Sequence, residues 1–365
     1  MTATTDRPAP PGPGAPAARN PRRRRTVIVL AITAVTLVVL AVVAACLGQV
    51  PVNPGEVVGS VLHRVGIDWF AMPSHPNGDA ALWEVRFPRV VLAILVGASL
   101  GCAGAVLQGV FANPLAEPGV IGVSAGAAVG ASSVILIGGA FSSSWAIAAA
   151  AFAGGLGTTL LVYGLARADG RTEVVTVILT GVAVNAVAGG LIAYFTFVAS
   201  PAAREQIVFW QLGTLGGADW DAVAVVAPLA VVGVGGSVLL ARKLDLLALG
   251  EGPARHLGVD VERVRRWAIV IVGVLVAAGV AFTGIIAFVG LVVPHAFRML
   301  IGPSHRMLIP ASTIGGAVVL LAADIGARTL VGNADLPLGM LTSLVGGPFF
   351  FWLLHRTRKS QGGWS

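Results

Sequence analysis

The sequence predicts an all-α protein that crosses a membrane many times, and three observations lead to this prediction. Of its 365 residues, 56% are apolar and only 11% are charged, whereas soluble domains carry about 25% charged residues. The mean hydropathy is +0.87, and the apolar residues fall in long uncharged runs of the length that spans a bilayer. The 48 glycines, with abundant alanine and valine, favour helices packed closely through small side chains. A soluble fold is therefore excluded.

The chain begins with a polar tail. Residues 1–25 are rich in proline, glycine and alanine and end in four arginines, a composition that cannot bury a core, so we expect a disordered cytoplasmic tail. The apolar run from Thr26 to Leu47 follows. It could be a signal peptide, and Val43–Cys46 faintly resembles a lipoprotein cleavage box. Because the run exceeds the usual apolar region of about 7–15 residues, we predict a first membrane span.

The rest of the chain supplies nine more candidate spans. Residues 49–83 are polar with scattered apolar positions, which predicts an external loop carrying a surface helix. One ten-helix domain is thus expected over residues 26–356, with a cytoplasmic tail at 357–365. The apolar stretches after the loop lie at about 90–111, 121–140, 145–166, 174–198, 222–241, 266–282, 285–301, 308–330 and 337–354.

The distribution of basic residues predicts the orientation. With the N-terminus inside, 19 of the 24 lysines and arginines lie on internal segments and 5 on external ones. This asymmetry follows the positive-inside rule and places both termini in the cytoplasm, as an even number of spans requires. The net charge of +7 could instead suggest nucleic acid, but its position beside the apolar runs favours topology as the cause.

Several kinds of chemistry are disfavoured by the residue types. Cys46 and Cys102 have no CxxC spacing, and the six histidines show no HExxH pattern, so no metal site or cofactor is expected. Lys243 and Lys359 each follow an arginine, which excludes a GxxxxGK[ST] phosphate loop. No catalytic arrangement is convincing either. The chain is therefore not an ATPase by itself, and we expect no enzyme activity.

A few polar residues lie where burial should cost free energy. A charge near the bilayer centre costs at least ~2.5 kcal/mol, so Asp324 in the ninth run needs a partner. Arg328, one turn later, is the predicted one. Gln108 and Asn185 are predicted to form hydrogen bonds between helices. Ion-coupled carriers usually embed several ionisable residues, and Asp324 is nearly alone, which disfavours secondary transport.

Two hydrophilic segments are distinctive. Asn113–Pro118 is a tight internal connection in which prolines should end one helix and start another. The chain from Asp245 to Arg266 predicts two short helices broken at residues 250–252, with Pro253 suited to a first helical position. Its apolar side chains would be surplus on a cytoplasmic surface unless a partner covers them, and they are Leu246, Leu249, Leu257 and Val259.

From about Trp83 to Leu354 the sequence resembles the FecCD-type permeases of ABC importers, which take up iron–siderophore complexes, haem or cobalamin. Each motif is weak alone, but their order along the chain is specific. They are Arg86–Arg89, similar to R-[LF]-P-R; Asn113–Pro118, which matches NPLAEP; Gly122–Ala127; Phe209–Gly213; Leu249–Val259; Gly290–His295; and Gly346–Phe350.

The resemblance implies a type II ABC importer permease fold with ten helices, paired as a two-fold dimer in the cell membrane. Partners would be a second permease subunit, cytoplasmic ABC ATPase subunits and an extracytoplasmic substrate-binding protein. It further implies that residues of about 245–262 form the loop coupled to the ATPase: Leu246, Leu249, Gly250, Glu251, Ala254, Leu257 and Gly258. Arg86, Arg89 and Arg328 match exposed arginines that dock the binding protein, with snorkelling as the alternative for the first two. Asn113, Pro114, Glu117 and Asp324 are expected to be structural polar positions.

Two departures from the family pattern concern its finer details. Before the last span the family has Glu-Leu-Pro, whereas this chain has Asp335-Leu336-Pro337, one methylene shorter. The connection from Arg167 to Thr172 lies in the region that gates the cytoplasmic exit of the family, but its motif is poorly defined.

The sequence is therefore interpreted as the permease subunit of an ATP-driven importer, with ferric siderophores as the expected substrate. Haem and cobalamin permeases share the same motifs, and a homodimer and a heterodimer both remain open. The rival functions are an ion-coupled secondary carrier and an intramembrane enzyme such as a lipid-modifying transferase.

Overall fold

The computed structural model describes residues 21–138, 143–168, 171–332 and 334–360. In these residues the regular secondary structure is helical apart from one small hairpin of two antiparallel strands, β1 (Arg167–Ala168) and β2 (Arg171–Thr172). The first helices are α1 (Pro21–Cys46), α2 (Pro54–Arg64), α3 (Gly78–Ala80), α4 (Phe87–Val110), α5 (Val123–Gly138), α6 (Ser144–Leu165) and α7 (Val174–Val198). The later ones are α8 (Pro201–Leu212), α9 (Trp220–Leu247), α10 (Glu251–His256), α11 (Val261–Thr283), α12 (Val289–Ile301), α13 (His305–Thr329) and α14 (Leu338–Ser360). A π-helical turn, η1 (Ala81–Arg86), leads into α4, and a 3₁₀ turn, η2 (Pro118–Ile121), leads into α5.

Ten apolar helices coincide with the ten predicted stretches. In the described residues, seven helical segments are long and apolar enough to cross a membrane, and they contain α1, α4, α6, α7, α9, α11 and α13. The shorter apolar helices α5, α12 and α14 fall on the remaining three stretches. The predicted all-α polytopic fold is therefore confirmed.

The ends of the chain differ in detail from the prediction. Residues 1–20 and 361–365 lie outside the described part of the chain. Helix α1 starts at Pro21, so the arginines at 23–25 already belong to its first turns instead of to a disordered tail. Helix α14 likewise continues to Ser360, past the predicted boundary at 356.

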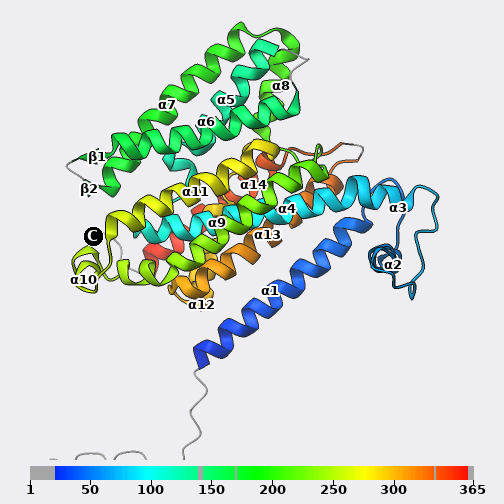
Figure 1. Cartoon of the computed structure of the whole chain (residues 1–365), viewed down its shortest axis with the longest axis horizontal. Coiled ribbons are helices and arrows are strands. Elements are labelled where there is room, and N and C mark those ends of the chain that lie inside the picture. The colour runs from blue at the N-terminus through cyan, green and yellow to red at the C-terminus, as the bar shows by residue number, and fades with distance from the viewer. Residues whose placement is uncertain (1–20, 139–142, 169–170, 333, 361–365) are drawn as a thin grey trace, which may run out of the picture.

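Helix α4 is the centre of the bundle. It runs alongside α13, α9 and α11 (Figure 1), and 78% of its most apolar window is buried. Glycine makes this closeness possible: a Cβ atom at Gly101 would lie 2.1 Å from the carbonyl oxygen of Ser312, and one at Gly104 would lie 1.8 Å from that of Gly290. Any other side chain at these two positions would separate the backbones, so packing here depends on small residues.

Two spans are far less buried than α4. Helix α1 lies along one side of the bundle, and α7 lies in the layer of α5, α6 and α8 on the opposite side (Figure 1). Only 6% of the apolar window of α1 and 17% of that of α7 are buried inside the chain. Their outward side chains, such as Val38 and Val187, are apolar and suit lipid or a second membrane chain.

The segment between α1 and α4 contains the predicted surface helix, α2. Asn53 and Glu56 form a capping box at its start. Glu56 accepts hydrogen bonds from the backbone N–H of Asn53 at 2.8 Å and from that of Ser74 at 3.0 Å. These bonds, that of Asn53 first, hold the pKa of the Glu56 carboxyl below its usual value. A single carboxylate thus ties the loop at Ser74 to the amino end of α2.

Candidate functional site

A charge cluster of five residues (Arg86, Arg89, Asp324, Arg328 and Asp335) lies where α4 begins and α13 ends, the side predicted to be external. Asp324 is completely buried. Arg89 donates from Nε to its Oδ1 at 2.9 Å, and Nε of Arg328 lies 3.2 Å from its Oδ2. The predicted Asp324–Arg328 pair is therefore present. Arg89 is an additional partner from 235 residues away, which no local spacing could predict.

Asp335 extends the cluster towards α14. Its Oδ2 accepts a hydrogen bond from Nη1 of Arg89 at 2.7 Å. Its side chain is 46% exposed, whereas that of Arg89 is only 12% exposed. Arg89 is therefore shared between a buried carboxylate on α13 and an accessible one in the connection before α14.

Two arginines of the cluster hold the carboxyl end of α1. Arg86 donates to the carbonyl oxygens of Ala45 at 2.8 Å, Cys46 at 3.2 Å and Val50. Arg328 donates to those of Ala44 at 3.3 Å and Leu47 at 3.4 Å. The last carbonyls of a helix lack intrahelical donors and carry partial negative charge, so guanidinium groups satisfy them well.

This arrangement corrects the expectation of exposed arginines. Arg86 is 5% exposed, and the side chains of Arg89 and Arg328 are each 12% exposed. All three guanidinium groups are bound within the chain, because Asp324 and the carbonyls at the end of α1 provide acceptors that a solvent-facing arginine would lack.

The Asn113–Pro118 connection folds back into the bundle. Helix α4 ends at Val110, three residues before Asn113, so Pro114 does not end it as predicted; Pro118 does open η2. The Asn113 side chain accepts from the N–H of Leu115 at 2.9 Å, and Glu117 accepts from the N–H of Phe288 at 3.0 Å. Asn113 thus shapes the turn, while Glu117 binds the backbone just before α12.

The predicted hydrogen bonds between helices are also present. Gln108 donates to the carbonyl oxygen of Leu291 at 3.2 Å, and Asn185 donates to that of Gly119 at 3.2 Å. Both residues therefore have a packing role.

At the opposite end of the bundle, the α10 loop (residues 248–260) joins α9 to α11 (Figure 1). The prediction of two short helices is wrong in its first half: α9 continues to Leu247 because Leu244 and Leu247 pack into the core. The break comes at Gly250, whose φ of +106° suits glycine, and Pro253 is the third residue of α10 instead of the first.

The apolar residues of this loop divide into two groups. Leu249 and Leu257 are 63% and 59% exposed. Ala254 and Val259 are buried and Leu246 is half-buried, which corrects the expectation that Leu246 and Val259 are surplus. The buried members fix α10 on the bundle, so the two exposed leucines stand on a rigid base. Gly258, with a φ of +81°, follows the end of α10 and begins the short connection to α11.

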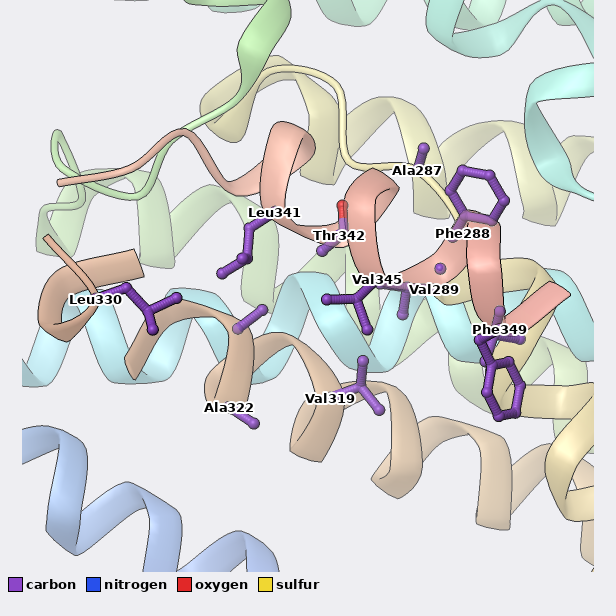
Figure 2. A pocket seen from close by; sticks show the side chains of 13 residues that line it. Ala287, Phe288, Val289, Val319, Ala322, Leu330, Leu341, Thr342, Val345 and Phe349 are labelled. Carbon is purple, nitrogen blue, oxygen red and sulfur yellow. The ribbon is translucent and has the colours of Figure 1, made fainter. Parts of the chain in front are cut away.

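The described residues contain no group of three or more His, Cys, Asp or Glu side chains that could hold a metal ion. A cavity of about 460 Å³ lies between α12, α13 and α14 and is lined by apolar side chains such as Phe288, Val345 and Phe349, with Thr342 as a polar exception (Figure 2). This cavity presents no charged group to a ligand.

Comparison with known proteins agrees with these features. The profile of the FecCD transport family matches residues 36–356. The hemin transport system permease protein HmuU of Yersinia pestis is 39% identical over 292 residues, which cover 78% of this chain and 86% of that protein. The cobalamin import system permease protein BtuC of Halobacterium salinarum is 41% identical over 292 residues, covering 78% of this chain and 76% of the relative.

A solved structure shows the same fold. It is described as an inward-facing conformation of a metal-chelate type ABC transporter, and it matches with a TM-score of 0.80 and 30% identity over 90% of this chain and 99% of that one. The family match, the identity over most of the length and the shared helical fold agree: the chain belongs to the FecCD transport family and is a membrane-embedded permease of an ABC importer.

Proposed function

We propose that this chain carries ferric siderophores across the cell membrane as one of two permease subunits, driven by cytoplasmic ATPase subunits. Both termini would lie in the cytoplasm, as the distribution of basic residues predicts. The observation that carries the proposal is the α10 loop, in which the exposed Leu249 and Leu257 lie on either side of a short helix anchored by the buried Ala254. Exposed apolar side chains on a rigid base are typical anchors for a protein partner.

The transport mechanism that we propose is alternating access. ATP binding by the partner subunits would move the α10 loops, and this movement would tilt the helices joined to them, opening the path to one side and then the other. The chain itself would make and break no bond. Its contribution would be to make different contacts with the ATPase subunits in each of its two conformations.

A binding protein would deliver the ligand at the charge cluster. Arg89 is the best-placed contact because its second partner, Asp335, is accessible on a connecting segment. A carboxylate of the binding protein could replace Asp335 on Arg89 through a charge-assisted hydrogen bond. Docking would then release the connection before α14 from its contact with Arg89.

The substrate itself is proposed by class. Two relatives are named for hemin and cobalamin, so the substrate would be a metal chelate carried as an intact complex. Ferric siderophores are the first candidates, and haem and cobalamin are the competitors that the test must include.

Reconstitution in liposomes tests the proposal. The chain should accumulate no solute alone, and with its ATPase and ligand-loaded binding protein it should accumulate one metal chelate in an ATP-dependent manner. Ferric siderophore, haem and cobalamin would be offered separately. Accumulation by the chain alone, driven by an ion gradient, would contradict the importer function. Uptake of haem or cobalamin in place of the siderophore would correct only the substrate.

A further inference from the structure

The start of α11 connects two segments that are far apart in the sequence. Arg265, in the second turn of α11, is 4% exposed. Its Nη2 binds Glu251 at the start of α10, and its Nη1 donates to the carbonyl oxygen of Thr172 at 2.7 Å. One buried guanidinium group therefore bridges the α10 loop and the β1–β2 hairpin that joins α6 to α7.

Thr172 is bound to α11 through three of its polar groups. Its N–H donates to Oε1 of Glu262 at 3.1 Å, and its hydroxyl donates to Oε2 of the same residue at 2.8 Å. Its carbonyl oxygen accepts from Arg265. Thr172 is itself buried, and it precedes the first residue of α7 by two positions. The amino end of α7 is thus fixed to α11 by Glu262 and Arg265.

Helix α7 is otherwise loosely held. Only 17% of its apolar window is buried, and its packing partners are α5, α6, α8 and η2, all outside the central group around α4. Glu251, by contrast, is the first residue of α10, and the exposed Leu257 follows the last residue of that helix. The Glu251–Arg265–Thr172 contact is therefore a direct polar link from the α10 loop to the base of a weakly packed span.

We propose that Arg265, supported by Glu262, is a positioning residue that transmits movement of the α10 loop to α7. This inference rests on the proposed function, in which an ATPase moves that loop. A displacement of Glu251 acts through the guanidinium group on the Thr172 backbone, and α7 follows because Thr172 is two residues away along the chain. The link operates without contact between Arg265 and the transported ligand.

The neighbouring basic residues supply a matched control. Arg263 lies two residues before Arg265 on α11, but its side chain is 71% exposed and pairs with Asp260 at 3.5 Å. It contacts neither Glu251 nor Thr172 through any hydrogen bond or ion pair found in the described residues. Replacing Arg263 therefore removes the same charge from the same helix and leaves the link intact.

The variant that breaks the link should still fold. In Arg265→Met, Glu262 keeps its two hydrogen bonds to Thr172, and Glu251, whose side chain is 44% exposed, keeps Arg255 and solvent. No fully buried carboxylate loses its last partner. Arg265→Lys retains the charge but cannot reach two acceptors with a planar fork, so it should restore function only in part.

The test uses the complete importer in liposomes. For Arg265→Met we expect an assembled complex with ATP hydrolysis close to that of the wild type, but about tenfold less ligand transported per ATP hydrolysed, a size typical of a lost coupling between sites. Arg263→Met should transport as the wild type does. Arg265→Lys should lie between them.

A distance measurement separates transmission from a merely structural role. Spin labels at Val175→Cys, an exposed position at the start of α7, would be placed in a chain with Cys46 and Cys102 replaced by serine. Nucleotide should change the distance between the labels of the two permease copies in the wild type and in Arg263→Met. In Arg265→Met the nucleotide-dependent change should be lost.

Two results would overturn the link. One is transport per ATP in Arg265→Met equal to that in Arg263→Met. The other is a parallel loss of assembly, hydrolysis and transport, which would indicate a structural role. If the wild-type complex transports no ligand at all with ATP, the proposed function is wrong. If the wild type transports normally and Arg265→Met is unaffected, only the proposed link is wrong, so the two failures can be distinguished.

Discussion

The candidate functional residues at the two ends of the bundle lie in opposite environments. At the charge cluster, Arg86 and Arg89 are turned inward and bound to Asp324 and to the end of α1. At the α10 loop, Leu249 and Leu257 point outward with no covering helix. At one end the charges are paired with groups of the same chain, and at the other end apolar side chains are left exposed.

This difference indicates how each end can meet another protein. On the function proposed above, the α10 loop would bind its partner without rearrangement, because Leu249 and Leu257 are already exposed. Docking at the charge cluster would first require the exchange of an internal contact, and the accessible Asp335 is the member that would exchange most easily. Permanent association is therefore expected at the loop and transient, charge-dependent docking at the cluster.

The largest effect should come from removing the centre of the cluster. Asp324→Ala would leave Arg89 and Arg328 without their buried carboxylate, and breaking a buried ion pair costs about 3–5 kcal/mol. Thermal unfolding of the purified protein in detergent would measure the loss. Asp335→Ala is the matched control and should cost at most about 1 kcal/mol, since its side chain is 46% exposed. Equal losses in the two variants would contradict a cluster centred on Asp324.

The next effect concerns the exposed end. Leu257→Asp, alone and with Leu249→Asp, should weaken ATPase binding by at least about 2 kcal/mol, because a charge would replace a desolvated anchor. The stability of the isolated permease should change by less than about 0.5 kcal/mol, as for an ordinary surface position. Co-purification and binding assays measure the first quantity and thermal unfolding the second. Arg263→Ala, on the adjacent helix, should leave both unchanged. Unaltered ATPase affinity in the double variant would remove the loop from the interface.

A smaller effect tests whether the cluster can open. Asp335→Asn should free Arg89 for a carboxylate of the binding protein and tighten docking by about 1 kcal/mol, the size of an exposed ion pair. Glu84→Gln removes the same charge from an exposed position near α4 and should have little effect. Binding would be measured at low and physiological salt, since screening weakens such contacts. Weaker docking in Asp335→Asn would mean that Asp335 orients Arg89 instead of competing for it.

The smallest effect is a pH dependence beside the cluster. The folded pKa of Glu56 is lowered by hydrogen bonds from Asn53 and Ser74, so its stabilisation is present above the unfolded value of about 4.3 and is lost as the pH falls through the folded value. Acidification below about pH 4 should therefore loosen the loop around Ser74 before the bundle unfolds. Hydrogen exchange of that loop would measure the change, and Glu56→Gln should abolish its pH dependence. A loop that opens at the same pH in both proteins would exclude Glu56 as the cause.

The spans and the site residues were not equally predictable. The ten apolar stretches could be located from hydropathy alone because each spanning helix must satisfy its backbone internally, which makes it a local property of the sequence. The pair of Asp324 and Arg328 was predictable because residues four apart lie on the same face of a helix. The sequence of the α10 loop showed more apolar side chains than a surface segment needs. It did not show which of those side chains would be buried.

What the sequence determined by itself is the fold class, the approximate spans and the segments that differ from a plain membrane helix. Its distribution of basic residues also predicts an orientation in the membrane. The tertiary structure alone decided the partners of the charges. Arg89 reaches Asp324 across 235 residues, and Arg265 reaches Thr172 across 93. The physical reason is that a buried charge accepts any suitably placed opposite group, and only the packing of α4 on α13 and of α11 on the hairpin determines which group is near.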